Sequence, residues 1–226
     1  LTILETMTPL DFLDFRDFLR PASGFQSIQF KIMEALLGLP FDQRFGQQYY
    51  TSQLNQHDID LVKKAEHEVS LFTLVDQWLS RMPFLNDTSY WKEENAFFES
   101  YRLVYDLSLQ DGEKQNLMSF DELFMKKHES NSRRLSIESN RAALFIMLFR
   151  DYPLLNTPFQ FINSLLEIDE LLAQWRYRHM NMVQRMIGRR IGTGGSTGAH
   201  YLKHAADSHY IFKEFADLTS FLIQRN

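Results

Sequence analysis

The sequence predicts an all-α protein on three observations. Its 226 residues include only nine glycines and six prolines, so few positions interrupt regular structure. Long segments repeat apolar residues at spacings of three and four, which is typical of amphipathic helices. The chain is 44% hydrophobic and holds twenty phenylalanines, enough apolar surface for a sizeable core. We therefore expect residues 1–226 to form a single helical domain.

Composition excludes several classes of site and partner. The chain has no cysteine, which rules out disulfides, thiolate-bound metals and a cysteine nucleophile. Its 24 basic and 29 acidic residues give a formal net charge of −5, and the two signs are interspersed, so no nucleic-acid partner is expected. No run of about 18 apolar residues predicts a membrane span, and no secretory leader pattern is present. We expect a cytoplasmic protein with no membrane partner, and Leu1 in place of an initiating methionine suggests a processed or partial chain.

Two helices are predicted near the N-terminus. Thr8-Pro9-Leu10-Asp11 combines a capping threonine, a proline at the first helical position and an acid at the third, which predicts a helix to about Leu19. After an interruption at 21–24, Ser23 can cap a second helix that Gly38 and Pro40 close. Its apolar positions on one face are Phe25, Ile28, Ile32 and Leu36.

The middle of the chain carries further helical patterns. One runs from about Asp58 to Met82, with Pro83 at its end, and others cover about 90–107 and 134–149. The most polar stretch, 110–132, is rich in charge, Gln, Asn and Ser. It predicts a surface helix or a loop in preference to a buried element.

A single long helix is predicted in the C-terminal third. Thr157-Pro158-Phe159-Gln160 forms a second helix-start signal, and the pattern runs to Ile187 with Gly188 at the stop. The segment 192–198 then contains four glycines, which suggests a flap over a small ligand, although a plain flexible connection fits the composition as well. A nucleotide-binding loop is a poor match, because no lysine is suitably placed and the loop follows a helix.

His179 is the leading candidate for a residue that binds a cofactor. It lies within an apolar stripe of the long helix that contains Leu172, Trp175, Met182, Val183 and Met186. A neutral imidazole in such a stripe can ligate a haem iron, and the competing interpretation is a core histidine bonded to a backbone carbonyl. The same helix carries Arg176, Arg178, Arg185, Arg189 and Arg190, most of which we expect to stay in water near the helix C-terminus.

Other candidates are weaker when taken alone. Arg16 stands near Phe12 and Phe15 and can hold a substrate carboxylate beside an aromatic pocket, or can simply pack its stem on the rings. His200 and His204 are four residues apart on a predicted helix. Without an evident third ligand, we expect both to be exposed.

Four stretches together resemble the tryptophan 2,3-dioxygenase family. They cover roughly the first 38 and the last 70 residues in the family's order and approximate spacing. The stretches are Leu4-Glu5-Thr6-Met7-Thr8-Pro9 with Phe15-Arg16-Asp17; Ser23-Gly24-Phe25-Gln26-Ser27-Ile28-Gln29-Phe30; Trp175-Arg176-Tyr177-Arg178-His179-Met180 through Met186-Ile187-Gly188; and Gly192-Thr193-Gly194-Gly195-Ser196-Thr197-Gly198 with Tyr201-Leu202.

The resemblance implies a helical bundle around a b-type haem, usually in a homotetramer. It implies a dioxygenase that uses O₂ to cleave the indole C2–C3 bond of L-tryptophan and gives N-formylkynurenine. Carried over to this sequence, His179 is the proximal haem ligand and Arg16 pairs with the substrate carboxylate. Ser23 and Gly24 line the pocket at the haem edge, and Thr193 contacts the amino-acid end of the substrate.

Two departures from the family pattern keep alternatives open. The family carries a tyrosine where this sequence has Phe12, which lies among the expected substrate-binding residues. The family also has a segment upstream of Leu1 that supplies a distal-pocket histidine, so no catalytic residue is assigned in this chain. The first departure favours a haem-dependent hydroxylase or oxygenase of another aromatic amino acid, and the second a non-catalytic haem-binding protein.

Overall fold

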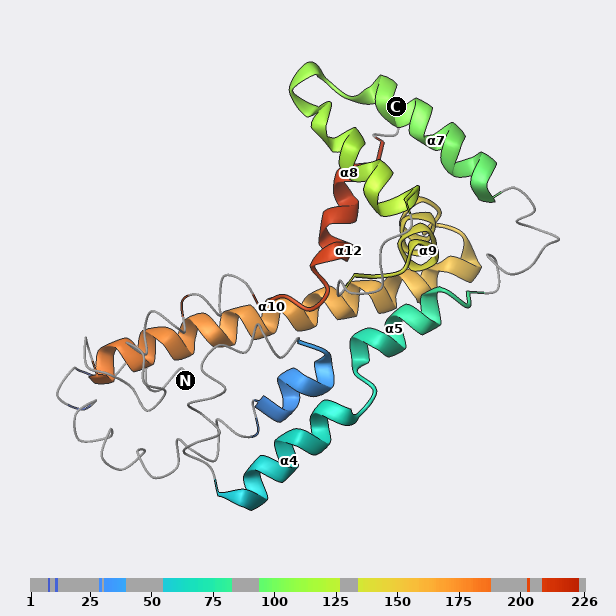
Figure 1. The fold of residues 1–226 in the computed structure, drawn as a ribbon. Helices are drawn as coiled ribbons and strands as arrows, with labels where there is room; N and C mark the ends of the chain where they lie inside the picture. Colours follow the sequence, from blue (N-terminus) through green and yellow to red (C-terminus); the bar gives the residue numbers. More distant parts are fainter. Residues whose placement is uncertain are drawn as a thin grey trace. The chain divides into compact units, whose positions relative to one another are not determined.

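Helices form the regular structure throughout the residues that the computed structural model describes (Figure 1). Those residues are 8, 11, 29, 31–39, 55–82, 94–126, 134–187, 203 and 209–223. Their elements are α4 (Gln56–His67), α5 (Leu71–Leu79), α7 (Glu94–Ser108), the 3-10 turn η2 (Asp111–Glu113), α8 (Gln115–Phe124), α9 (Ile137–Leu148), α10 (Pro153–Ile187), α12 (Lys213–Asp217) and the 3-10 turn η3 (Leu218–Phe221). The all-α prediction is confirmed. Within these ranges no helix is both long and apolar enough to traverse a bilayer.

Contacts within the chain divide it into two compact units. Unit 1 comprises Leu1–Leu71 and Ile168–Ile211, and unit 2 comprises Phe72–Glu167 and Phe212–Asn226. The expectation of a single domain stays a prediction.

The first predicted helix start is confirmed at the two residues described there. The hydroxyl of Thr8 accepts a hydrogen bond from the Asp11 backbone N–H at 3.3 Å, and the Asp11 carboxylate accepts one from the Thr8 N–H at 2.9 Å. The Thr8 hydroxyl also donates to the Asp11 carboxylate, at 2.6 Å. This bond and the one from the Thr8 N–H lower the pKa of Asp11, so the acid stays ionised at the helix start.

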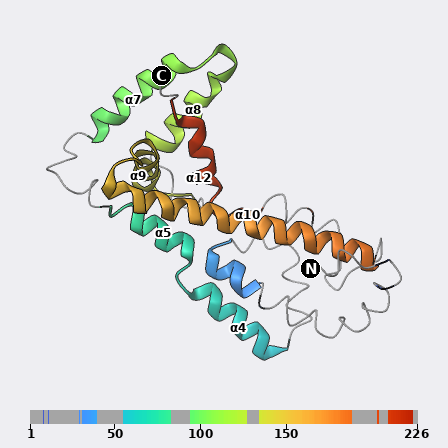
Figure 2. The ribbon, with the colours of Figure 1, turned by 180° about the vertical axis from the view of Figure 1, so that it is seen from behind.

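The buried face of the second predicted helix is not the apolar one. Residues 31–37 are helical, and Gly38 ends the helix as predicted, with a φ of 100° that favours glycine. Lys31, Glu34 and Ala35 are buried, whereas Leu36 is 41% exposed. Both views draw this helix between α4 and the part of α10 that belongs to unit 1 (Figure 1 and Figure 2). The spacing of apolar residues did not predict this buried face, because the face contains charged side chains that are stabilised by ion pairs.

The pattern from Asp58 to Met82 forms two helices instead of one. α4 ends at His67, and Glu68 adopts an extended conformation with a φ of −75° and a ψ of 152°. Ser70 directly precedes α5 and is a residue type favoured at helix starts, a signal that the continuous apolar pattern concealed. Val62 is buried in α4, and Val75 and Leu79 are buried in α5.

α10 begins earlier than predicted. It starts at Pro153, and Pro158 lies inside it, so Thr157-Pro158-Phe159-Gln160 is wrong as a helix start. The turn before it is already formed, because the Asn156 N–H donates to the Tyr152 carbonyl at 3.1 Å. Proline fits the first turn of a helix, which suits Pro153, and Pro158 removes one further backbone bond without ending the helix. The helix ends at Ile187 as predicted.

The helices predicted at about 90–107 and 134–149 are confirmed as α7 and α9 where the chain is described. Ser136 caps α9 by accepting a bond from the Ser139 N–H at 3.2 Å. The Asp76 carboxylate on α5 accepts bonds from the Ser136 N–H at 2.7 Å and from its hydroxyl at 2.9 Å. The start of α9 is thereby fixed to α5.

A helix, one of the two forms expected for the polar stretch 110–132, is found there as α8, but two of its side chains enter the core. Its Phe120 and Phe124 are fully buried, and their ring centroids lie 4.7 Å apart. Phe124 also contacts Phe98 of α7 at 5.9 Å and Phe221 of η3 at 5.3 Å. Two phenylalanines four residues apart form one apolar face, and the many polar residues around them hid that face. This aromatic cluster is part of the core of unit 2.

Two tyrosines of α7 fix the last described segment to this core. The Tyr101 hydroxyl donates to the Phe221 carbonyl at 2.7 Å, and the Tyr105 hydroxyl donates to the Ser220 carbonyl at 2.9 Å. Burial raises the pKa of both phenols, so both remain protonated donors at neutral pH.

An ion pair between α7 and α8 predicts a pH-dependent part of the stability. Arg102 binds the Asp121 carboxylate through two nitrogens, with Nη2 2.7 Å from Oδ2. The hydrogen bond from Arg102 holds the pKa of Asp121 below its ordinary value. The pair therefore stabilises the folded state above the ordinary carboxyl range and loses that effect as the pH falls through the lowered pKa.

The Asp121→Asn variant measures this contribution. We expect a loss of about 0.5–1 kcal/mol in the free energy of unfolding at pH 7, because both side chains are partly solvated. The difference from the wild type should begin to shrink as the pH falls to about 4 and should disappear below the lowered pKa of Asp121. Urea unfolding at several pH values checks this. A difference that stays constant down to pH 2.5 would show that the charge of Asp121 is not its cause.

Candidate functional site

His179 lies on α10 with its ring half-buried. The indole of Trp175, one turn earlier, is stacked on the imidazole, with ring centroids 5.0 Å apart and planes 6° apart. Burial lowers the pKa of His179, so the imidazole is neutral at physiological pH. A neutral imidazole offers the lone pair that a metal ligand requires.

The surroundings of His179 agree with the predicted stripe where they are described. Leu172 and Met182 are half-buried, and Ala173 is buried. The side chains of Val183 and Met186 lie outside the described residues. A neutral, half-buried histidine beside a flat aromatic ring is of a kind that could hold a haem.

A cluster of buried charges lies one turn before His179. Arg176 is 2% exposed, and its Nη1 donates to the His209 carbonyl at 2.8 Å. Its Nη2 lies 3.6 Å from Oε1 of Glu34, and the His209 Nδ1 lies 3.6 Å from the same oxygen. The second carboxylate oxygen accepts a hydrogen bond from Lys31 Nζ at 2.9 Å. Burial alone would raise the pKa of Glu34, but His209 and Lys31 outweigh burial and leave the pKa lowered.

This cluster was missed by the sequence analysis. Arg176 was one of five arginines of which most were expected in water, and Arg178 and Arg185 are indeed exposed. Arg189 and Arg190 lie outside the described residues. The only local signal was that Lys31 and Glu34 share a face with Ala35, whose small side chain permits close packing. Nothing in the sequence pairs that face with Arg176.

The predicted substrate residues cannot be placed. Phe12, Arg16, Ser23, Gly24 and Thr193 lie outside the described residues, as do the glycine-rich segment 192–198, His200 and His204. Their roles therefore stay predictions.

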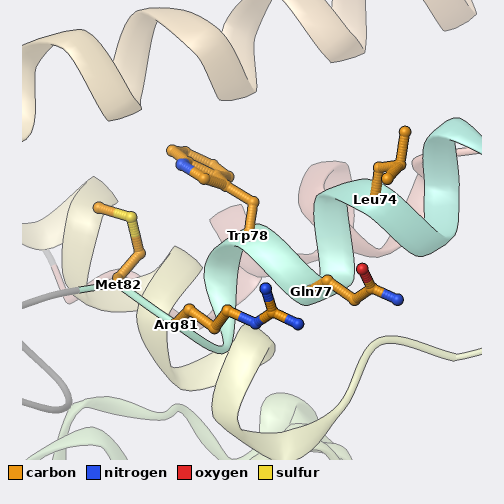
Figure 3. Close-up of a pocket in the computed structure, with 5 residues that line it drawn as sticks. All are labelled: Leu74, Gln77, Trp78, Arg81 and Met82. Atoms are coloured by element: carbon orange, nitrogen blue, oxygen red, sulfur yellow. The ribbon is translucent and has the colours of Figure 1, made fainter.

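A shallow pocket of about 320 Å³ in unit 2 was not foreseen (Figure 3). It is lined by Leu74, Gln77, Trp78, Arg81 and Met82. Trp78 points toward α10, where its ring meets Phe161 edge-on with centroids 5.0 Å apart (Figure 3). Its described lining residues include no predicted site residue.

Comparison with known proteins identifies the family. The pattern of the family described as "Tryptophan 2,3-dioxygenase" matches residues 1–222. A tryptophan 2,3-dioxygenase of Alteromonas mediterranea is 42% identical over 249 residues, which cover 100% of this chain and 69% of that protein. One of Dictyostelium discoideum is 41% identical, covering 100% and 62%, and one of Mus musculus is 36% identical, covering 100% and 61%. The chain thus spans 61% to 69% of the length of these relatives. The resemblance noted in the sequence is confirmed, and the chain belongs to the tryptophan 2,3-dioxygenase family.

Proposed function

We propose that the protein is a haem-dependent dioxygenase that uses O₂ to cleave the indole C2–C3 bond of L-tryptophan and gives N-formylkynurenine. The observation that carries this is the family match over residues 1–222, joined by relatives of 36–42% identity that are named tryptophan 2,3-dioxygenase. That match favours dioxygenation over the hydroxylase and the non-catalytic alternatives.

His179 would hold a b-type haem through its imidazole. The support is its place on α10, its half-buried ring, the stacked Trp175 and a pKa that burial lowers. When bound, haem supplies the oxygen chemistry that amino-acid side chains lack. The protein's part is to bind and orient the substrate and to exclude water.

The amino-acid end of the substrate would be held by residues of the two outer motifs. Arg16 would form a bidentate pair with the carboxylate, and Thr193 would contact the same end. Ser23, Gly24 and Phe12 would line the pocket, with Phe12 lacking the hydroxyl that the family's tyrosine provides. A homotetramer completes the proposal by resemblance to the family, and the cytoplasmic location stays a prediction from the sequence.

Arg16→Gln tests the substrate assignment. Loss of a charge-assisted bidentate pair is expected to raise the KM for L-tryptophan about 10- to 100-fold. The visible spectrum of the substrate-free protein should not change, because Arg16 would not touch the iron. Steady-state kinetics and an absorption spectrum check both points. An unchanged KM would remove Arg16 from the substrate site.

Product analysis under ¹⁸O₂ tests the reaction class. The protein, loaded with haem and given L-tryptophan, should form a product that contains two ¹⁸O atoms. A product with one ¹⁸O atom would instead indicate hydroxylation. Haem uptake without any oxygenated product from tryptophan or another aromatic amino acid would support the non-catalytic alternative.

A further inference from the structure

One face of α10 in unit 1 is attached to a segment far along the chain. Asp169 and Arg176 are seven residues apart, which places both on that face. The Asp169 carboxylate accepts the Ile211 N–H through both oxygens, at 2.9 and 3.1 Å. Arg176 donates to the His209 carbonyl at 2.8 Å. Two attachments two turns apart fix both the rotation and the axial position of α10 against residues 209–211.

Glu34 adds a third segment to the same attachment. It is 1% exposed and stands within 3.6 Å of both Arg176 Nη2 and His209 Nδ1. Its other oxygen is bound by Lys31 from its own helix. Buried charges are costly unless their partners stay in place, so this contact resists movement of Arg176 more specifically than apolar packing would.

The same turn of α10 carries the candidate haem ligand. His179 follows Arg176 by three residues, an axial rise of about 4.5 Å. Trp175, which is stacked on His179, directly precedes Arg176. Any rotation of α10 that displaced Arg176 would therefore displace the imidazole as well.

We propose that Glu34 is a positioning residue for His179, acting through Arg176 to hold the turn of α10 that presents the imidazole. This inference rests on the proposed ligation of haem by His179. Glu34 itself touches neither haem nor substrate in this account. By holding this turn, Glu34 fixes the direction in which the imidazole points and limits its motion. The rate at which haem dissociates depends on both.

The test compares Glu34→Gln with Asp121→Asn in the haem-loaded protein. Glutamine keeps the shape of Glu34 but leaves Arg176 without its buried carboxylate. We expect haem to dissociate about tenfold faster or more from Glu34→Gln and the iron–histidine stretching band of the ferrous protein to shift. Asp121→Asn removes an ion pair of unit 2, so it should lower stability but leave both haem signals unchanged. Equal haem signals in the wild type and in Glu34→Gln would overturn the proposal.

A double variant separates the effect on the position of His179 from the effect of burying the Arg176 charge beside a neutral side chain. Combining Glu34→Gln with Arg176→Met removes both charges of this pair and leaves Lys31 in place, so we expect folding stability to recover in part. Haem dissociation should stay fast, because the attachment of α10 through Arg176 is still missing. Wild-type haem retention in the double variant would overturn the proposal, and this arm also decides the matter where Glu34→Gln alone fails to fold.

Hydrogen exchange distinguishes failure of this inference from failure of the proposed function. A wild-type protein that takes up no haem overturns the proposed function. In that case, faster exchange of the amides at 177–181 in Glu34→Gln than in Asp121→Asn would still support the positioning of His179 by Glu34. Equal exchange in the two variants would overturn it.

Discussion

Replacing His179 with alanine is expected to abolish stable haem binding. The imidazole is the side chain that would hold the haem, and its loss should lower haem affinity by at least about 100-fold. Burial keeps the ring neutral in the folded protein, so it is ready to bind a metal without first losing a proton. Haem titration followed by visible absorption measures the affinity of the variant against that of the wild type.

His57→Ala is the matched control for this prediction. His57 is exposed on α4, so its replacement should leave both haem affinity and the spectrum unchanged. A His179→Ala protein that retained haem with the wild-type spectrum would refute the ligand assignment. Loss of haem from both variants would show instead that removing any histidine disturbs the protein.

The second large effect is expected from Phe120→Ala in the core of unit 2. Phe120 is fully buried and contacts Phe124 at 4.7 Å and Tyr105 at 5.4 Å. Truncating a buried phenylalanine removes its apolar contacts and leaves a cavity, so we expect a loss of about 3–5 kcal/mol in the free energy of unfolding. Denaturant unfolding of the variant and the wild type gives the difference.

Met118→Ala supplies the control from the same helix. Met118 is 75% exposed, so its replacement should change stability by no more than about 0.5 kcal/mol. Similar losses for the two variants would mean that the buried Phe120 side chain contributes no more to stability than the exposed Met118 side chain. The burial of Phe120 would then not account for the stability of unit 2.

Local sequence signals predicted most helices but not which residues they bury. The bonds between Thr8 and Asp11 and the glycine conformation at Gly38 follow from interactions within four residues, and both were predictable. The burial of Phe120 and Phe124 depends on Phe98 and Phe221, which are far away in sequence. A polar segment with two well-spaced phenylalanines therefore looked like surface until its partners were known.

At the candidate site, too, local contacts were predictable from the sequence and long-range contacts were not. The stacking of Trp175 on His179 follows from helical spacing, and the motif around them was sufficient to indicate the family. The pairing of Glu34 with Arg176 joins positions 142 residues apart (176 − 34 = 142), and each residue alone resembles a surface charge. Such pairs form only when tertiary packing brings the two residues together, and no local sequence pattern predicts that packing.

The central claim is that this protein binds haem through His179 and presents it to tryptophan. The most direct measurement is a haem titration of the protein, followed by the absorption spectrum of the ferrous form before and after L-tryptophan is added. The account predicts a Soret band that saturates at one haem per chain and changes when L-tryptophan binds. Absence of haem uptake, or a haem spectrum that does not change at saturating L-tryptophan, would contradict this claim.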